Sequence, residues 1–270
     1  MKITVLCDNH VSWGKDLVGE HGFSAFIEAR GHRILFDTGQ GIGLLRNAKV
    51  LGIPLSEVES IVLSHGHFDH TGGLRDALAE ARGTKLIAHP DVFSPKYHVK
   101  EGESYYIGIP FSREAIEGWG AEVLLERGPR EIAPGIFTTG EVPGERTDEE
   151  LMVKGPEGFV RDPLLDDLSL VIDDPKGLVL ILGCAHAGLL SILEHVQGLF
   201  GKRPFLLILG GTHVGPLEPE RRREIIRGLG RYEIRAMAVA HCTGAENLPL
   251  FVEQMGQRAF LAHVGMCLEV

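Results

Sequence analysis

The sequence predicts an α+β fold in which two similar halves pack sheet against sheet with helices outside, a four-layer αββα sandwich. Each half begins with two apolar runs around a short turn, as β-hairpins do, in residues 22–39 "GFSAFIEARGHRILFDTG" and 168–183 "LSLVIDDPKGLVLILG". Each half then alternates apolar strands with helical patterns. No linker of biased composition separates the halves, so residues 1–270 are predicted to form a single domain.

The elements follow from apolar spacing and from glycine and proline. The opening "KITVLC" predicts a strand before the first hairpin. Helical spacing predicts helices at residues 41–52, 74–83, 187–201, 218–230 and 247–256, most of them ending near a glycine. Further strands are predicted at residues 60–63, 84–90, 204–211, 234–242 and 258–270.

Two segments break this pattern. Residues 91–110 are rich in proline, glycine and tyrosine, and residues 141–167 form a second such region. A long irregular segment inside a compact domain is more often functional than idle. We therefore expect a lid or a substrate wall for residues 91–110, with a plain surface loop as the alternative.

Composition excludes several classes of function. The net charge of −10 argues against a nucleic-acid partner or an anionic membrane, although a local basic pocket for a phosphate stays open. No window approaches the roughly 18 apolar residues of a membrane span. The scattered cysteines favour reduced thiols and a cytoplasmic location: Cys7, Cys184, Cys242 and Cys267. The expected partner is a small-molecule substrate, and a homo-oligomer stays open.

The stretch "SHGHFDHTGG" holds the strongest chemical signal, directly after the apolar run at residues 60–63. Residues at i and i+2 beyond a strand point the same way, so His65 and His67 can chelate one ion. Asp69 and His70 lie where the chain turns into a helix and can face a second ion. The spacing therefore predicts half of a two-metal site.

The motif H-x-H-x-D-H in this stretch resembles the signature of the metallo-β-lactamase superfamily. The run "ILFDTG" (residues 34–39) is similar to the earlier strand motif of the same superfamily. The resemblance implies the αββα fold already predicted from the pattern. It also implies that Asp37 accepts a hydrogen bond from a ligand histidine and fixes its tautomer, with a turn-capping role as the alternative.

The superfamily supplies further ligands, and here the sequence departs from its usual pattern. The chain has Asp166 and Asp167 where a middle histidine is expected, and Cys184 where a bridging aspartate is expected. His186 ends a strand two residues later, so we expect it to be a ligand. Asp167 and Cys184 are each candidates for a ligand or a supporting residue, with turn solvation and burial as the alternatives. The resemblance places the superfamily's last histidine ligand at His241.

The other histidines are assigned by position. His213 follows a strand and two glycines, and is expected to line the substrate pocket, with a structural role as the alternative. His21 and His89 are weaker candidates for the same pocket role, and a surface position in a loop is the alternative for His21. We expect surface positions for His32, His98 and His195, and a packed position for His263.

The runs "GCAHAG", "GGTHVG" and "HCTG", with the early "EHGFSAFIE", resemble one branch of the superfamily. That branch is labelled 7,8-dihydropterin-6-methyl-4-(β-D-ribofuranosyl)-aminobenzene-5′-phosphate synthase-like metal-dependent hydrolases. The resemblance implies a hydrolase that uses metal-bound hydroxide, steered by Asp69, on a small anionic ester, phosphoester or pterin-like metabolite. A synthase or transferase of the branch type is the first alternative. A non-hydrolytic redox or sensory metal protein is the second.

The expected cofactors are two divalent metal ions. Mixed nitrogen and oxygen ligands favour zinc, and manganese or iron are alternatives.

Overall fold

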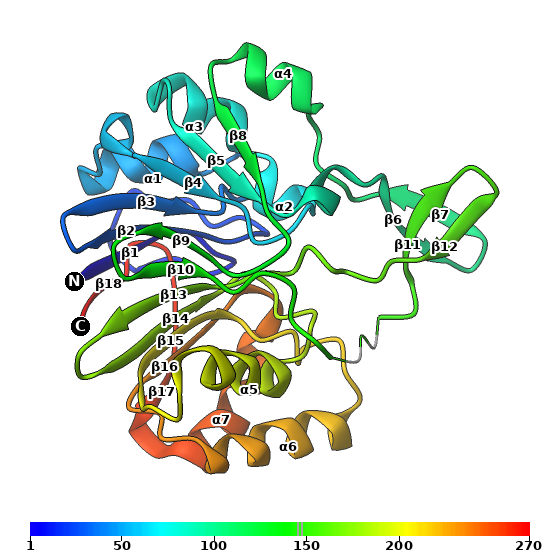
Figure 1. Cartoon of the computed structure of the whole chain (residues 1–270). Helices are drawn as coiled ribbons and strands as arrows, with labels where there is room; N and C mark the ends of the chain where they lie inside the picture. Colours follow the sequence, from blue (N-terminus) through cyan, green and yellow to red (C-terminus); the bar gives the residue numbers. More distant parts are fainter. Residues whose placement is uncertain (145, 147) are drawn as a thin grey trace.

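Two β-sheets lie face to face at the centre of the computed structural model, with helices on both outer faces (Figure 1). The structure describes residues 1–144, 146 and 148–270; residues 145 and 147, within the second segment expected to be irregular, lie outside the described residues. The four layers are the αββα sandwich that the sequence predicts, and this prediction is confirmed.

The first sheet has the strand order β18-β1-β2-β3-β4-β5-β8. Strands β1 to β3 are antiparallel neighbours, and β3, β4, β5 and β8 run parallel. Its strands are β1 (Lys2–Cys7), β2 (Ser24–Ala29), β3 (His32–Phe36), β4 (Ser60–Val62), β5 (Lys85–Ala88), β8 (Glu122–Leu125) and β18 (Cys267–Glu269).

The second sheet has the order β17-β16-β15-β14-β13-β10-β9, and β14 to β17 run parallel. Its strands are β9 (Arg130–Ala133), β10 (Ile136–Thr138), β13 (Leu170–Asp174), β14 (Gly177–Leu182), β15 (Phe205–Gly211), β16 (Met237–Ala240) and β17 (Ala259–Leu261).

The helices divide between the two outer faces. Those over the first sheet are α1 (Leu44–Leu51), α2 (Phe68–Thr71), α3 (Leu74–Glu80) and α4 (Arg113–Gly118). Those over the second are α5 (Leu189–Phe200), α6 (Pro219–Gly228) and α7 (Leu248–Met255) (Figure 1). Single turns of 3₁₀ helix are η1 (Leu55–Glu57), η2 (Pro90–Phe93), η3 (Leu229–Arg231), η4 (His241–Thr243), η5 (Ala245–Asn247) and η6 (Gly256–Arg258).

Successive side chains along a strand point to opposite faces of its sheet and so pack into different layers of the core. On β2, Ala25 and Ile27 enter the core between the sheets, and Phe26 between them enters the core under the helices. The inner core joins residues of both sheets, for example Phe36 and Ile181, both fully buried. Burying one such side chain stabilises the fold by about 1.5–3 kcal/mol, so the alternation fixes which face of each sheet is inward.

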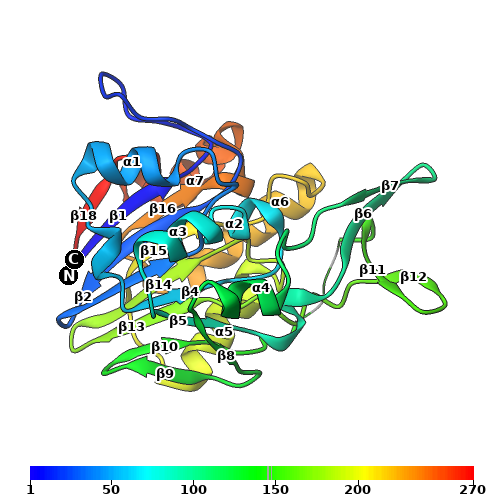
Figure 2. The ribbon, with the colours of Figure 1, turned by 90° about the horizontal axis from the view of Figure 1, so that it is seen from above.

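The two segments expected to be irregular fold together into a third sheet with the order β12-β11-β6-β7. Its strands are β6 (Lys96–Lys100), β7 (Glu103–Tyr106), β11 (Leu151–Gly155) and β12 (Gly158–Arg161). It projects from the body of the molecule at the end away from the termini (Figure 2). The expectation of irregular structure was wrong here, because each hairpin is completed by a partner about fifty residues away in the sequence.

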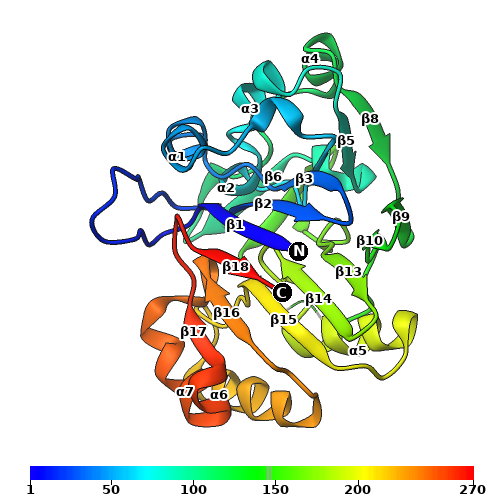
Figure 3. The same ribbon diagram turned by 90° about the vertical axis from the view of Figure 1, so that its left-hand side faces the viewer.

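The end of the chain also differs from its prediction as one strand at residues 258–270. It forms β17 in the second sheet and then crosses to form β18 beside β1 in the first. This crossing brings the two termini together, with the Met1 amino group donating to the Val270 carbonyl at 2.9 Å (Figure 3). Among the described residues, no helix has the length and apolar character that crossing a membrane requires.

Candidate metal centre

The titratable side chains gather at one edge of the sandwich, where strands of both sheets end. Parallel neighbours place their carboxyl ends at the same edge, and there the loops carry the functional groups. The contributing strands are β1 before Asn9, β3 before Asp37, β4 before residues 64–70, β14 before Cys184 and His186, β15 before His213 and β16 before His241.

The first donor set is His65, His67 and His186, whose ligand atoms all lie within 4.8 Å of one another. His65 Nε2 is 2.9 Å from His67 Nδ1. The Nε2 atoms of His67 and His186 are buried and have no hydrogen-bond partner among the described residues. Leaving a buried polar atom unpaired costs about 1–3 kcal/mol. Three converging imidazoles, two of them with an unpaired buried nitrogen, therefore fit a divalent metal ion such as zinc.

The second donor set is Asp69, His70 and His241. His241 Nε2 lies 3.1 Å from Asp69 Oδ2 and 3.3 Å from His70 Nε2, and Asp69 Oδ2 lies 3.7 Å from His70 Nε2. His241 Nδ1 donates to Asn9 Oδ1 at 3.0 Å, which leaves Nε2 directed at the set. Two imidazoles and a carboxylate suit a second divalent ion.

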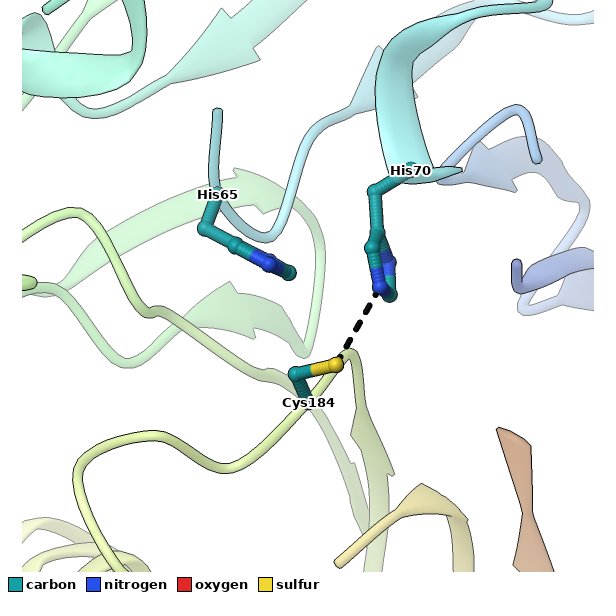
Figure 4. A group of neighbouring side chains, drawn as sticks. All are labelled: His65, His70 and Cys184. Carbon is teal, nitrogen blue, oxygen red and sulfur yellow. Dashed lines mark hydrogen bonds between the residues drawn. The ribbon is translucent and has the colours of Figure 1, made fainter. Parts of the chain in front are cut away.

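Cys184 lies between the two sets. Its sulfur is 3.3 Å from His70 Nε2 and groups with His65 and His70 within 4.8 Å (Figure 4). This is the position that the resemblance gives to a bridging aspartate. Cys184 is 4% exposed, so its thiol is almost fully shielded from solvent.

Asp37 and Ser64 hold the histidines of both sets. Asp37 Oδ2 accepts from His70 Nδ1 and from Ser64 Oγ, each at 2.7 Å, and Ser64 Oγ in turn accepts from His65 Nδ1 at 2.9 Å. One carboxylate thus fixes the tautomers of His65 and His70, so that both present Nε2. Sequence analysis missed Ser64; its place directly before the first histidine was the only signal.

Ser64→Ala should weaken metal binding about 10- to 100-fold, because the partner of His65 Nδ1 is lost. Titration of metal-depleted protein against a chelator of known affinity measures this. Ser94→Ala, in the loop after η2, is the matched control and should leave the affinity unchanged. Equal affinity in Ser64→Ala and the control would show that the hydrogen bond has no role in holding His65.

Asp148 supports the two histidines of the second half and was missed by sequence analysis. Its Oδ2 accepts from His186 Nδ1 at 3.1 Å, and its Oδ1 accepts from His213 Nε2 at 2.8 Å. Burial opposes its ionisation, but these hydrogen bonds outweigh burial and hold the pKa of Asp148 well below its ordinary value. No motif marks Asp148, because it comes from a segment without regular pattern.

Asp167 does not join either donor set. Its Oδ2 accepts from the Ala187 amide at 2.7 Å and so braces the loop that carries His186. Its neighbour Asp166 accepts from the Gly66 amide at 2.8 Å and from Lys96 Nζ at 2.9 Å. Both aspartates therefore position the loops of the site.

Close packing explains the glycine between the first two histidines. A Cβ built on Gly66 would lie 2.2 Å from the Val92 carbonyl oxygen, so only glycine fits. Residues other than glycine adopt positive φ at Asp37 (55°), Ala185 (52°), His213 (52°) and His241 (47°). Such strained backbone gathers at functional sites, where the surrounding structure enforces it.

The electrostatics of the donors differ between the sets. Burial and the neighbouring imidazoles hold the pKa values of His65 and His67 well below normal, so both rings are neutral and ready to bind metal. Burial opposes the charged form of His70, but Asp37 and Asp69 raise its pKa to about 9. Burial also opposes ionisation of Asp69, yet His70, His21 and His241 hold its pKa well below normal.

The donor sets open into a cavity of about 800 Å³. His21 lines it, with its Nε2 3.2 Å from Asp69 Oδ2, and so does His213. The projecting sheet supplies one wall, including Lys100 and also His98, whose side chain is 35% exposed, in line with the surface position expected for it. Part of residues 91–110 therefore forms a wall of the cavity, which is one of the roles expected for that segment.

His89 is not among the cavity's lining residues in the described part of the chain, against the expectation that it lines the pocket. It is 1% exposed, and its Nε2 lies 2.9 Å from Glu141 Oε1 while its Nδ1 accepts from the Asp91 amide. It caps the 3₁₀ turn η2 with its side chain and does not join the donor sets. A strand end alone could not reveal these partners.

Comparison with known proteins identifies the family. A model of the metallo-beta-lactamase superfamily matches residues 17–215. The chain belongs to this superfamily. Superfamily members generally bind metal ions, and this membership agrees with the two donor sets.

Two curated relatives come from Methanocaldococcus jannaschii. One, named 7,8-dihydropterin-6-methyl-4-(beta-D-ribofuranosyl)-aminobenzene-5′-phosphate synthase, is 31% identical over 284 residues, which cover 98% of this chain and 95% of the relative. The other, an uncharacterised protein, is 32% identical over 250 residues, which cover 91% of this chain and 92% of the relative. The resemblance to this branch is thereby confirmed over nearly the whole chain.

Solved structures share the fold. Tm1679, described as a metal-dependent hydrolase of the beta-lactamase superfamily, aligns with a TM-score of 0.86 and 27% identity over 100% of this chain and 99% of its own. Zn²⁺-bound PqqB from Methylobacterium extorquens aligns with a TM-score of 0.59 and 13% identity over the full length of both chains. The second likeness shows the fold alone.

Proposed function

We propose that this protein is a metal-dependent hydrolase with a dinuclear centre. His65, His67 and His186 would hold one ion, and Asp69, His70 and His241 the other, with Cys184 between them. The observation that carries the proposal is that two donor sets lie at one cavity, which His67 and His186 of the first and Asp69 and His241 of the second line, and that buried imidazole nitrogens of the first set have no protein partner among the described residues. Zinc suits these donors best.

Two such ions would supply Lewis acidity and a lowered pKa for a coordinated water. The chain's own groups do the rest. Asp37, Asp148 and Asn9 each accept a hydrogen bond from a ligand histidine and so keep the opposite nitrogen free for metal. The strained loops hold these groups before substrate arrives, so little reorganisation is needed.

Asp69 and His21 form the proton-handling pair. The low pKa of Asp69 keeps it a carboxylate, which suits ligation and hydrogen-bond acceptance better than proton donation. His21 is 57% exposed at its side chain, faces Asp69 Oδ2 at 3.2 Å, and has a pKa raised chiefly by that hydrogen bond. Asp69 thus orients His21, and the imidazole is placed to hold or release a proton in the cavity.

The cavity volume suits a small-molecule substrate. The described lining is rich in carboxylates, including Glu149, Glu150, Glu218 and Glu246, and Lys100 is paired with Glu150 at 3.1 Å. An anionic group of an ester or phosphoester substrate would therefore face the two ions rather than the cavity mouth. We also propose a cytoplasmic location, which the free thiols support.

A synthase is the second candidate, because the 31% identical relative is named a synthase and the similarity covers 95% of its length. The same pair of ions would activate an electrophile for either reaction. Hydrolysis needs water to reach the centre, whereas a synthase must seat a second substrate in the cavity.

Metal-depleted protein reloaded with zinc, manganese or iron, and assayed on carboxylic esters, lactones, phosphomonoesters and phosphodiesters, tests the hydrolase. We expect turnover with at least one ion and its loss in His241→Ala. His263→Ala, which removes a histidine bound to Ser12 away from the donor sets, should stay active. No turnover on any of these substrates with any ion would reject the hydrolase, and turnover only with two organic substrates would favour the synthase.

A further inference from the structure

We propose that Cys184, Cys242 and His213 hold a third metal ion, a thiophilic one, beside the two donor sets. The two sulfurs and one imidazole nitrogen lie within 4.8 Å of one another. They come from the loops after β14, β15 and β16, three neighbouring parallel strands. Cys242 and His213 belong to neither of the two donor sets described above, although both line the cavity.

His213 carries the arrangement typical of a metal-bound histidine. Its Nε2 donates to Asp148 Oδ1 at 2.8 Å, and its Nδ1 is buried without a hydrogen-bond partner among the described residues. Ligand histidines regularly give one ring nitrogen to a carboxylate and the other to metal. Asp148 does the same for His186, so one carboxylate would serve a ligand of each ion.

The backbone makes room for the sulfur atoms. A Cβ on Gly211 would lie 2.5 Å from Cys242 Sγ, so a side chain at this strand end would displace the thiol. His213 is held at φ 52° and His241, just before Cys242, at φ 47°. In this conformation Cys242 Sγ lies 3.5 Å from the Cys184 carbonyl oxygen. The strained backbone at His213 and His241 directs the side chains of His213 and Cys242 to the same point instead of to solvent.

The donor types indicate the class of ion. Two sulfurs and one imidazole favour zinc, copper(I) or cobalt(II) over magnesium or calcium, which prefer oxygen. Two thiolates balance the charge of a divalent ion, and binding would displace the proton of the buried Cys184 thiol, whose pKa burial raises. Since Cys184 also lies 3.3 Å from His70 Nε2, its thiolate would link the third ion to the dinuclear centre.

Cobalt(II) titration of metal-depleted, reduced protein tests the proposal, because sulfur-to-cobalt charge transfer gives an absorption that imidazole and carboxylate ligands do not. We expect three bound ions per chain by elemental analysis, together with this absorption. Cys242→Ser and His213→Ala should each bind one ion fewer, and Cys242→Ser should lose part of the absorption. Cys267→Ser, at an exposed position, is the matched control and should change neither.

The dinuclear proposal is tested separately in the same titration. His67→Ala should lose an imidazole-bound ion and keep the absorption that depends on Cys242. Saturation of the wild type at two ions, or identical stoichiometry and absorption in Cys242→Ser and Cys267→Ser, would overturn the third site. Thermal unfolding of each variant checks that its fold is intact, and His213→Ala repeats the test from a different strand.

Discussion

His186→Ala is expected to weaken binding of the first ion at least about 100-fold and to abolish turnover. Even the loss of a residue that supports a ligand costs about 10- to 100-fold in affinity, and a lost ligand costs more. The ring cannot be replaced by a neighbour, because His65 and His67 already converge there and His213 is held by Asp148. Chelator competition followed by elemental analysis measures the loss.

His195→Ala is the matched control for this change. His195 lies on α5, a few residues after His186, and its Nε2 donates to the Thr139 carbonyl at 3.1 Å, away from the donor sets. The His195→Ala variant should retain full metal content and turnover. If His186→Ala also retained both, His186 would not be a ligand and the first donor set would be wrong.

Lys96→Met is expected to destabilise the protein by about 3–5 kcal/mol, because it leaves two buried carboxylates without their counter-charge. Lys96 is 1% exposed on β6, and its Nζ lies 2.7 Å from Asp162 Oδ2 and 2.9 Å from Asp166 Oδ1. Since Asp166 also holds the Gly66 amide, this lysine ties the projecting sheet to the loop of the first histidines. Urea unfolding monitored by circular dichroism measures the change.

Lys100→Met, on the same strand, provides the comparison. Lys100 is 55% exposed and pairs with Glu150 at 3.1 Å. An exposed pair of this kind contributes about 0–1 kcal/mol, so this variant should unfold close to the wild type. Equal stability of the two variants would mean that the buried ion pairs of Lys96 with Asp162 and Asp166 do not stabilise the fold.

Local sequence was enough to predict the layers. The turn "ARGHR" needs Arg30 and Gly31 at positive φ, and both adopt it between β2 and β3. The helix at residues 41–52 was predicted from its spacing and its final glycine, and α1 ends with Gly52 at φ 67°. These features depend on a few adjacent residues, so the pattern alone specifies them.

Contacts between distant segments could not be read in the same way. The pairing of Met152 with Tyr97 turns two proline- and glycine-rich segments into one sheet, and neither segment carries the signal alone. The same holds for Asp148, which reaches His186 and His213 across 38 and 65 residues. Its role depends on where the loop lies, and no local spacing records that.

The sequence by itself determined the sandwich, the strand end that carries His65 to His70, and the superfamily. These depend on apolar periodicity and on a motif six residues long, both of which act over short distances in the chain. Only the tertiary structure decided that Asp167 braces a loop, that His89 pairs with Glu141, and that Cys184 lies between the donor sets. Those outcomes depend on directions of side chains from separate strands, and folding sets these only when the two sheets meet.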